Sequence, residues 1–317
     1  MLFGRKKKGE GKTFLILDIE TGSVGGALLR QGYPGDPPRL FGEMRVDLPA
    51  GGSRDAHTLR ERAAQAVLSI ARSLAEVAAR LRRHPATARA GAVQRASVFL
   101  AAPWGTPNLE VGYPTFNEPL VHSIDIAVAS TFDVPVSFHA RASAALNGAR
   151  LLLPYEGTYL LCMPTGELVE GLSVERGVVR SYGTLPAGRH TIIRTLGSHT
   201  GLNEQEARSA LRATSLGQPL VHINEPYVAA GQHMAREFTS LARDLGWHAH
   251  ERVYALTHDN DWFARSLAGS DAATLFAPGA TIKHLQGTYA SPHFAQHSET
   301  PDLPLMLGGM FVDGHYR

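Results

Sequence analysis

The sequence predicts an α/β protein built from two halves of similar order. Three observations support this prediction. A chain of 317 residues with 44% hydrophobic content is longer than a single hydrophobic core usually accommodates. Apolar runs of strand length alternate with helical patterns, and the order meander, helix, strand, helix occurs twice. No residue-level repeat accompanies the second occurrence. We expect a basic, flexible leader at residues 1–12 and two α/β units at residues 13–154 and 155–317.

The first half is expected to open with a three-stranded meander followed by a long helix. Its strands are predicted at residues 13–18, 24–29 and 40–48. Ser53 or Asp55 can cap the helix, which runs to about Arg83 and is stopped by His84-Pro85. Apolar side chains recur along it at helical spacing, which predicts one face packed on a sheet.

Strands and helices then alternate to the end of the chain. Further strands are predicted at residues 97–102, 134–136, 158–163, 168–174, 178–182 and 252–257. Further helices are predicted at residues 122–132, 140–153, 190–198, 203–212, 227–245 and from 262 onward. A histidine-rich loop leads to residues 303–312, which are apolar enough for a core element.

Composition excludes several classes of protein. Charged residues make up 19% and the net charge is +2, which argues against global disorder and against a dedicated nucleic-acid binder. The sequence contains no run of 18 apolar residues, so no membrane span is predicted. The apolar stretch that a signal peptide would have after Arg5–Lys8 is missing as well. The lone Cys162 fits a reducing cytoplasm. The cations of the leader are interpreted as a solvated end, with attraction to anionic lipid as the second interpretation.

The strongest candidate for chemistry is the run Asp18-Ile19-Glu20-Thr21-Gly22-Ser23, in which a carboxylate at a strand end precedes a glycine turn. An aspartate there can hold hydrated Mg²⁺ while the turn amides face phosphate oxygens. The run fits a nucleotide-phosphate hairpin, because a second apolar strand follows at once. It also resembles the Asp-x-Glu-Thr-Gly motif of DnaQ-like exonucleases, in which Asp18 and Glu20 would bind metal. A third interpretation is that both acids are only polar residues at a strand end.

The exonuclease interpretation needs further acids and a histidine. The candidates are His258-Asp259-Asn260-Asp261 and His297 with Asp302, which lie more than 230 residues downstream, whereas an exonuclease fold is far more compact. The predicted long helix also fits such an enzyme poorly. We keep this interpretation as the weaker alternative.

Nearly the whole chain, from residue 13 to 312, resembles the actin-like ATPase superfamily, in particular the bacterial branch that contains the pilus-assembly protein PilM and the cell-division protein FtsA. Leu17–Val24 is similar to the first phosphate motif, and residues 158–177 occupy the place of the second phosphate hairpin. The basic start, Met1–Lys8, is like that of PilM-like proteins. Four more stretches match in order: the connecting helix at 140–153, the Gly-containing entry to the next helix at 185–191, the helix after it at 201–211, and the strand before the adenosine motif at 252–257.

This resemblance implies a two-lobed actin-like fold, with duplicated α/β domains around an interlobe cleft, and ATP with Mg²⁺ as a weakly bound ligand. The residues that it implies for nucleotide contact, with Asp18 also holding Mg²⁺ through water, are Asp18, Thr21, Gly22, Ser23, Thr165, Gly166 and Gly188. Nucleotide would bias the closure of the lobes.

Several positions depart from the pattern of the family. Glu20 stands where the family usually has glycine, and two negative charges ~4 Å apart repel by about 4 kcal/mol at an effective dielectric near 20. Met163 stands where the second hairpin should carry an aspartate, and Pro164 lacks an amide. His139 stands where an acid or amide should polarise water, and His258-Asp259 replaces two glycines of the adenosine motif. Hydrolysis is therefore expected to be slow or absent, and no catalytic residue is assigned.

The function that follows is a scaffold of type IV pilus assembly, or of a related membrane-associated division complex, that binds a short cytoplasmic peptide of a membrane protein. We expect a cytoplasmic protein, peripheral at the inner membrane, that could self-associate and binds no nucleic acid. The alternative is an active, FtsA-like ATPase of cell division. Residues 303–312 lack the basic polar face of an amphipathic tail, which favours the PilM side.

Overall fold

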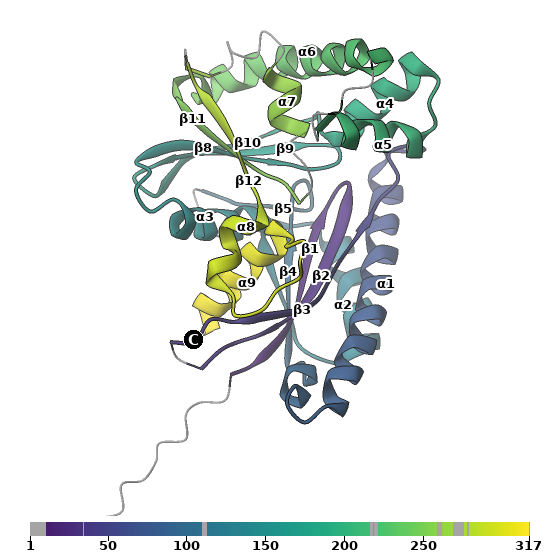
Figure 1. Ribbon diagram of the computed structural model, residues 1–317, viewed down its shortest axis with the longest axis vertical. Helices are drawn as coiled ribbons and strands as arrows, with labels where there is room; N and C mark the ends of the chain where they lie inside the picture. The colour runs from purple at the N-terminus through teal and green to yellow at the C-terminus, as the bar shows by residue number, and fades with distance from the viewer. Residues whose placement is uncertain are drawn as a thin grey trace, which may run out of the picture.

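The computed structural model has two lobes, each built on a five-stranded sheet (Figure 1). It describes residues 11–33, 35–109, 113–215, 218, 221–258, 262–268, 276–277 and 279–316. The predicted leader lies outside these residues apart from its last two positions. Asp259, Asn260 and Asp261 of the candidate exonuclease set also lie outside them.

The first sheet has the strand order β3-β2-β1-β4-β7. Its strands are β1 (Thr13–Glu20), β2 (Ser23–Arg30), β3 (Arg39–Asp47), β4 (Arg95–Leu100) and β7 (Val136–Ala140). The first three form an antiparallel meander, and β4 and β7 continue the sheet in parallel from β1. All eight residues of β1 are buried, because the sheet is covered on both faces.

The second sheet repeats this topology, with the order β10-β9-β8-β11-β12. Its strands are β8 (Thr158–Pro164), β9 (Val169–Glu175), β10 (Val178–Leu185), β11 (Arg252–Leu256) and β12 (Thr281–Leu285). Again an antiparallel meander is followed by two parallel strands. The shared strand order confirms the prediction of a duplicated α/β fold.

The strand β12 contradicts the prediction of a loop before residue 303. It pairs with β11 over five residues at the edge of the sheet. Edge strands need little burial, and only Leu285 of Thr281–Leu285 is fully buried. The segment therefore does not need the apolar run by which a strand is found in the sequence. Pairing with a neighbouring strand, rather than hydrophobic patterning, places it in the sheet.

Two helices cover one face of the first sheet, α1 (Ala56–Arg83) and α2 (Glu118–Phe132). The predicted cap is present, because the Asp55 carboxylate accepts hydrogen bonds from the His57 and Thr58 amides, and α1 ends at Arg83 as expected. Short elements join these helices to the sheet. They are η1 (Ala88–Gly91), β5 (Gly105–Thr106) and β6 (Thr115–Phe116).

Helices of the second lobe lie at the upper end of the molecule in Figure 1, and four of them fall within the described residues. They are α4 (Arg189–Thr200), α5 (Glu204–Ser215), α6 (Val221–Asp244) and α7 (Trp262–Ala268). The other short elements are η2 (Trp247–Ala249), α8 (Gly287–Ala290) and η4 (Ser291–His293). Helix α6 begins six residues before the predicted start at 227 and contains Pro226 near its beginning.

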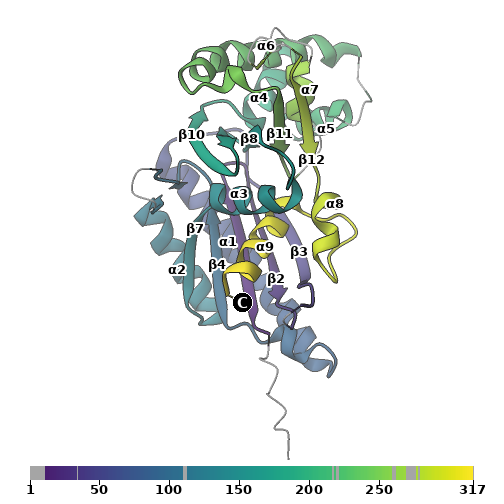
Figure 2. The ribbon, with the colours of Figure 1, turned by 90° about the vertical axis from the view of Figure 1, so that its left-hand side faces the viewer.

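The last helix, α9 (Leu303–Tyr316), returns to the first sheet, where it packs beside α3 (Arg141–Leu152) on the face opposite α1 (Figure 2). Buried apolar side chains line α9, and Gly308 allows it to approach Phe99 closely, since a Cβ there would lie 2.9 Å from that ring. The end of the predicted unit 155–317 thus covers the sheet of the unit 13–154. The division at residue 154 stays a prediction. Helix α9 belongs to the second unit by sequence but packs on the sheet of the first.

Acid should weaken the contact between β7 and α9. His139 stacks on Phe99, with 5.2 Å between ring centroids, and lies 5.0 Å from Phe311. Burial, with a smaller effect of His315, lowers the pKa of His139 to about 4. In the unfolded chain the usual value near 6.5 applies, so as the pH falls the unfolded chain is protonated first. The stability that neutral His139 contributes is therefore fully present above pH 6.5 and is lost as the pH falls towards 4.

Urea denaturation across this pH range measures the effect. We expect the free energy of unfolding to fall between pH 6.5 and 4, and the His139→Phe variant to show a shallower fall. His190, His250 and His258 also have lowered pKa values, mainly through burial, so part of the pH dependence should remain in that variant. Equal slopes for the two proteins would contradict the role of His139.

Candidate functional site

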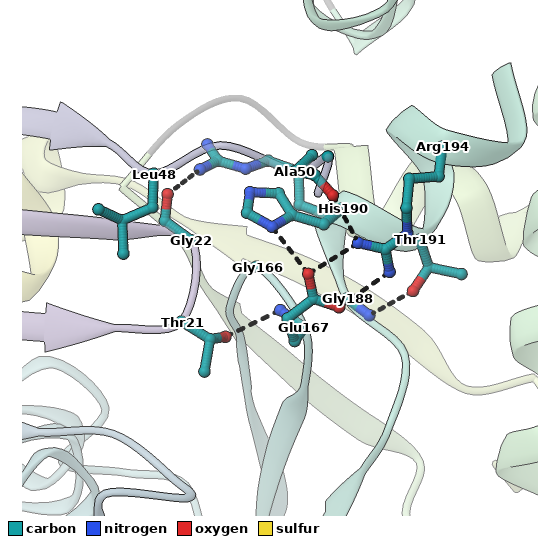
Figure 3. Close-up of polar contacts among 12 residues, drawn as sticks. Thr21, Gly22, Leu48, Ala50, Gly166, Glu167, Gly188, His190, Thr191 and Arg194 are labelled. Atoms are coloured by element: carbon teal, nitrogen blue, oxygen red, sulfur yellow. Dashed lines mark hydrogen bonds and ion pairs between the residues drawn. The ribbon is translucent and has the colours of Figure 1, made fainter. Parts of the chain in front are cut away.

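The turns of the two predicted phosphate hairpins touch each other between the lobes (Figure 3). The Thr21 and Thr165 hydroxyls are hydrogen-bonded at 2.9 Å, and the Glu167 amide donates to the Thr21 hydroxyl at 2.8 Å. A Cβ on Gly22 would lie only 2.5 Å from the Gly166 Cα, so the backbones of the two turns are in direct contact. A phosphate group would have to separate them to bind between them.

The Glu20 carboxylate accepts the hydrogen bonds that a phosphate would need. Its Oε2 accepts from the amides of Gly22, at 2.8 Å, and Gly166, at 2.7 Å, which belong to different hairpins. Its Oε1 accepts from the Ser23 hydroxyl at 2.6 Å. Glu20 is buried, so the negative charge that the sequence places in this motif is held inside the protein by its own donors.

Asp18, the predicted Mg²⁺ residue, is paired with two arginines. Arg45 Nη2 lies 2.9 Å from Asp18 Oδ2, and Arg141 Nε lies 3.2 Å from Asp18 Oδ1. Arg45 also makes a bidentate contact with Asp302, at 2.6 and 3.0 Å. Burial alone would lower the pKa of Arg45, but Asp302 and Asp18 outweigh it and raise that pKa above its usual value. Each Asp18 oxygen therefore lies beside a guanidinium, although Oδ1 accepts no hydrogen bond.

The guanidinium of Arg45 reaches Asp18 because of a glycine on the neighbouring strand. Gly25 on β2 is the register partner of Arg45 on β3. A Cβ on Gly25 would lie 2.6 Å from Arg45 Nη2, so a side chain there would displace the guanidinium. The glycine-rich second strand thus accommodates an arginine rather than a nucleotide.

The N-terminus of α4 points its amides at the second hairpin. The Arg189 amide donates to Thr165 O at 3.0 Å, and the His190 amide donates to Gly166 O at 2.7 Å. Gly188 packs so closely that a Cβ on it would lie 2.5 Å from both carbonyl oxygens. The amides at a helix N-terminus can bind an anion, but here they donate to the backbone of the second hairpin instead.

The side chains of α4 continue this contact through Glu167, the residue after the second turn. Glu167 accepts from His190 Nδ1 at 3.0 Å and from Arg194 at 2.7 and 2.8 Å. Burial would raise the pKa of Glu167, but His190 and Arg194 lower it to about 2. Glu167 is therefore ionised at neutral pH, and it fixes the second turn against α4.

The segment that follows β3 is held by the second lobe as well. Arg189 Nη2 lies 3.0 Å from Asp47 Oδ1, and the Glu204 carboxylate accepts from the Ala50 and Gly51 amides at 2.8 and 3.0 Å. Arg208 on α5 donates to Leu48 O at 2.5 Å. These contacts bind the two lobes to each other.

A cavity of about 790 Å³ lies beside this closed contact, between β3, α4, α5 and the segments after β11 and β12. Its lining includes Arg45, Asp47 and Arg189, but none of the seven residues predicted to contact nucleotide. His258, at the predicted adenosine motif, lies in its wall with Nε2 3.1 Å from Arg189 Nη1. Burial, together with Arg45, Arg189 and Arg141, lowers the pKa of His258 well below its usual value.

Asp18, Thr21, Gly22, Ser23, Thr165, Gly166 and Gly188 do come together, as the sequence predicts for one site. They do not fit ATP with Mg²⁺, because the hairpin amides already donate to Glu20 and the Asp18 oxygens face arginines. Among the described residues there is no group of three or more His, Cys, Asp or Glu that could hold a metal ion. Their role in nucleotide binding stays a prediction, and this geometry does not favour it.

Two acids of the exonuclease alternative, Asp18 and Asp302, are paired with arginines. Asp302 does lie near Asp18, as that interpretation requires, but Arg45 lies between the two carboxylates. A guanidinium in that position neutralises the charge that two metal ions would neutralise in such an enzyme. Glu20 faces the hairpin amides instead.

Arg45, Arg141 and Glu170 are the important residues that the sequence did not reveal. Glu170 on β9 is the register partner of Met163, where the family resemblance implies an aspartate. It accepts from the Tyr182 hydroxyl at 2.9 Å, and burial raises its pKa to about 7. The three residues lie in strand or helix patterns without a local motif. The pairing of Arg45 with Gly25 would have been visible only once the strand register was known.

Comparison with known proteins identifies the fold. No family model matches the chain, and no curated protein matches its sequence. A solved PilM–PilN type IV pilus biogenesis complex is 14% identical over 96% of this chain and 99% of that one, with a TM-score of 0.59. The ethanolamine utilization protein EutJ from Carboxydothermus hydrogenoformans is 11% identical over 95% of this chain and 89% of that one, with a TM-score of 0.55. A ROK family glucokinase from Streptomyces griseus, solved with glucose and AMPPNP, is 13% identical over 96% and 99%, with a TM-score of 0.53.

The chain therefore has the two-lobed actin-like ATPase fold, with PilM among its structural neighbours. This confirms the family resemblance drawn from the sequence at the level of fold. The neighbours differ in role, so the fold alone assigns none of these roles to this chain. Within the described part of the chain, no helix combines the length and apolar character of a membrane span.

Proposed function

We propose that this chain is an actin-like scaffold that holds its two lobes together without nucleotide and works by binding a protein partner. The partner that we propose is a short cytoplasmic peptide of a membrane protein in type IV pilus assembly or a related division complex. The observation that carries the proposal is the Glu20 carboxylate, which accepts hydrogen bonds from both hairpin turns at 2.7 and 2.8 Å.

Further contacts support a scaffold rather than an ATPase. The charge of Asp18 is neutralised by Arg45 and Arg141, so it is not available to orient Mg²⁺. Met163 cannot orient a water, and Glu170 opposite it is bonded to Tyr182. The PilM neighbour was solved in complex with PilN, which supports a protein partner for this chain as well.

An ATPase assay tests the proposal. We expect no Mg²⁺-dependent phosphate release above the background of an Asp18→Ala variant, and no rise in Tm when ATP and Mg²⁺ are added. A ligand that binds only the folded state at a hundred times its Kd would raise the free energy of unfolding by about 2.7 kcal/mol, which thermal unfolding detects easily. Phosphate release that Asp18→Ala abolishes would overturn the proposal in favour of an active ATPase.

Partner binding is the positive half of the test. Fluorescence anisotropy can measure binding of labelled cytoplasmic segments of the membrane proteins encoded beside this chain. We expect one of them to bind with equal affinity in the presence and absence of ATP, because the lobes are already closed. Binding that requires ATP would contradict the nucleotide-independent scaffold.

A further inference from the structure

The charge of the chain is divided unevenly along its sequence. Residues 77–95 contain five arginines and no acid, and residues 5–12 carry a net charge of +4. The net charge of the whole chain is only +2, so the remaining residues together are net negative. The positive charge of the chain is therefore concentrated in these two segments.

The fold brings residues 77–95 and Lys12, the last cation of the other basic segment, to one end of the molecule. Helix α1 ends beside the start of β1, at the lower end in Figures 1 and 2. The Thr13 hydroxyl donates to Arg89 O at 3.0 Å, and the Gln94 amide donates to Thr13 O at 2.9 Å. We call this region the basic end. Its exposed cations among the described residues are Lys12, Arg80, Arg82, Arg83 and Arg89.

Few acids oppose these cations. Arg80, Arg82 and Arg83 form no ion pair within 4.0 Å with the part of the chain that the structure describes. The loops at the same end of the first sheet contribute Asp36 and Asp133, which leave it net positive. Arg80, Arg82 and Arg83 therefore remain available to an external anion.

We infer that the basic end docks on a membrane surface that contains anionic phospholipid. A flat membrane touches only the tip of an elongated molecule. It therefore attracts the basic end without approaching the rest of the chain, which is net negative. The net charge of only +2 argues against a dedicated nucleic-acid binder. Clusters of four to eight arginines or lysines are typical of binding to anionic headgroups, and several such weak contacts add up. The inference agrees with the proposed function but needs no peptide partner.

Vesicle co-sedimentation of the full chain tests the inference. We expect binding to vesicles that contain phosphatidylglycerol, none to vesicles of phosphatidylcholine alone, and release as the salt concentration rises. The triple variant Arg80→Glu, Arg82→Glu, Arg83→Glu should bind about a hundredfold more weakly, since each cation near such a surface contributes on the order of 1 kcal/mol. All three side chains are exposed, so the variant should keep its fold.

A matched variant, Arg54→Glu, Arg72→Glu, Arg176→Glu, changes the net charge equally at exposed positions outside the basic end and should bind as the unmodified chain does. The inference is overturned if phosphatidylglycerol vesicles do not bind, or if both triple variants lose binding equally. It is also overturned if duplex DNA binds more tightly than the vesicles with the same dependence on Arg80, Arg82 and Arg83. Because no ATP and no peptide are present, the result does not depend on the proposed function.

Discussion

Replacing Arg45 by alanine should lower the free energy of unfolding by about 3–5 kcal/mol, the usual cost of removing one partner from a buried ion pair. Arg45 is shared by Asp18 and Asp302, and Asp18 is only 1% exposed. Without the guanidinium, the Asp18 carboxylate keeps Arg141 but loses its shorter contact. Urea denaturation followed by circular dichroism measures the loss.

Arg180 provides the control for this experiment. It pairs with Glu175 at 2.8 Å, but both side chains are exposed, so Arg180→Ala should cost no more than about 1 kcal/mol. A double variant, Arg45→Met with Asp18→Asn, removes both charges of one pair and should lose less than the sum of the single changes. The interpretation of Asp18 and Arg45 as a coupled buried pair fails if Arg45→Ala is no more costly than Arg180→Ala.

Replacing Glu20 by glutamine should lower the free energy of unfolding by about 2–3 kcal/mol and loosen the contact between the hairpins. Three donors face the carboxylate, namely the Gly22 and Gly166 amides and the Ser23 hydroxyl. A glutamine offers one acceptor oxygen, and its NH₂ group would face a donor. If the NH₂ group takes the place of Oε2, both amides lose their acceptor; if it takes the place of Oε1, the Ser23 hydroxyl loses its acceptor and the amides bond a neutral oxygen.

Hydrogen exchange reports on this contact directly. The Gly166 amide should exchange faster in Glu20→Gln than in the unmodified chain, while amides in the middle of β1 should change little. Glu175→Gln, at an exposed position, serves as the matched control and should leave both the exchange rates and the stability unchanged. Unchanged protection of Gly166 in Glu20→Gln would contradict the role of Glu20.

Much of the fold could be predicted from sequence, because local signals agree with the final structure. The helix that begins after Asp55 shows both its cap and its apolar face in the sequence, and the buried strands β1 and β8 show continuous apolar runs. Strand β12 could not be found in this way, since an exposed edge strand needs no apolar run. The return of α9 to the first sheet could not be found either, because an apolar helix does not specify which sheet it covers.

The position of the candidate site could be predicted from the sequence, but the contacts between its side chains could not. Glu20 departs visibly from the family pattern, and its negative charge was expected to oppose phosphate. That the carboxylate instead accepts an amide from the other lobe depends on a contact between residues 146 positions apart. The same holds for Arg45 and Asp302, which are 257 positions apart and carry no common motif.

The path of α9 has a consequence for how the protein is made. Phe14, Leu29 and Phe99 of the first sheet share a buried cluster with Leu307 and Met310 of α9. While a ribosome is still synthesising the second lobe, that apolar face lacks the cover of α9, so the lobe that emerges first can be completed only after α9 has been made. During this interval a chaperone is the natural substitute for the missing helix.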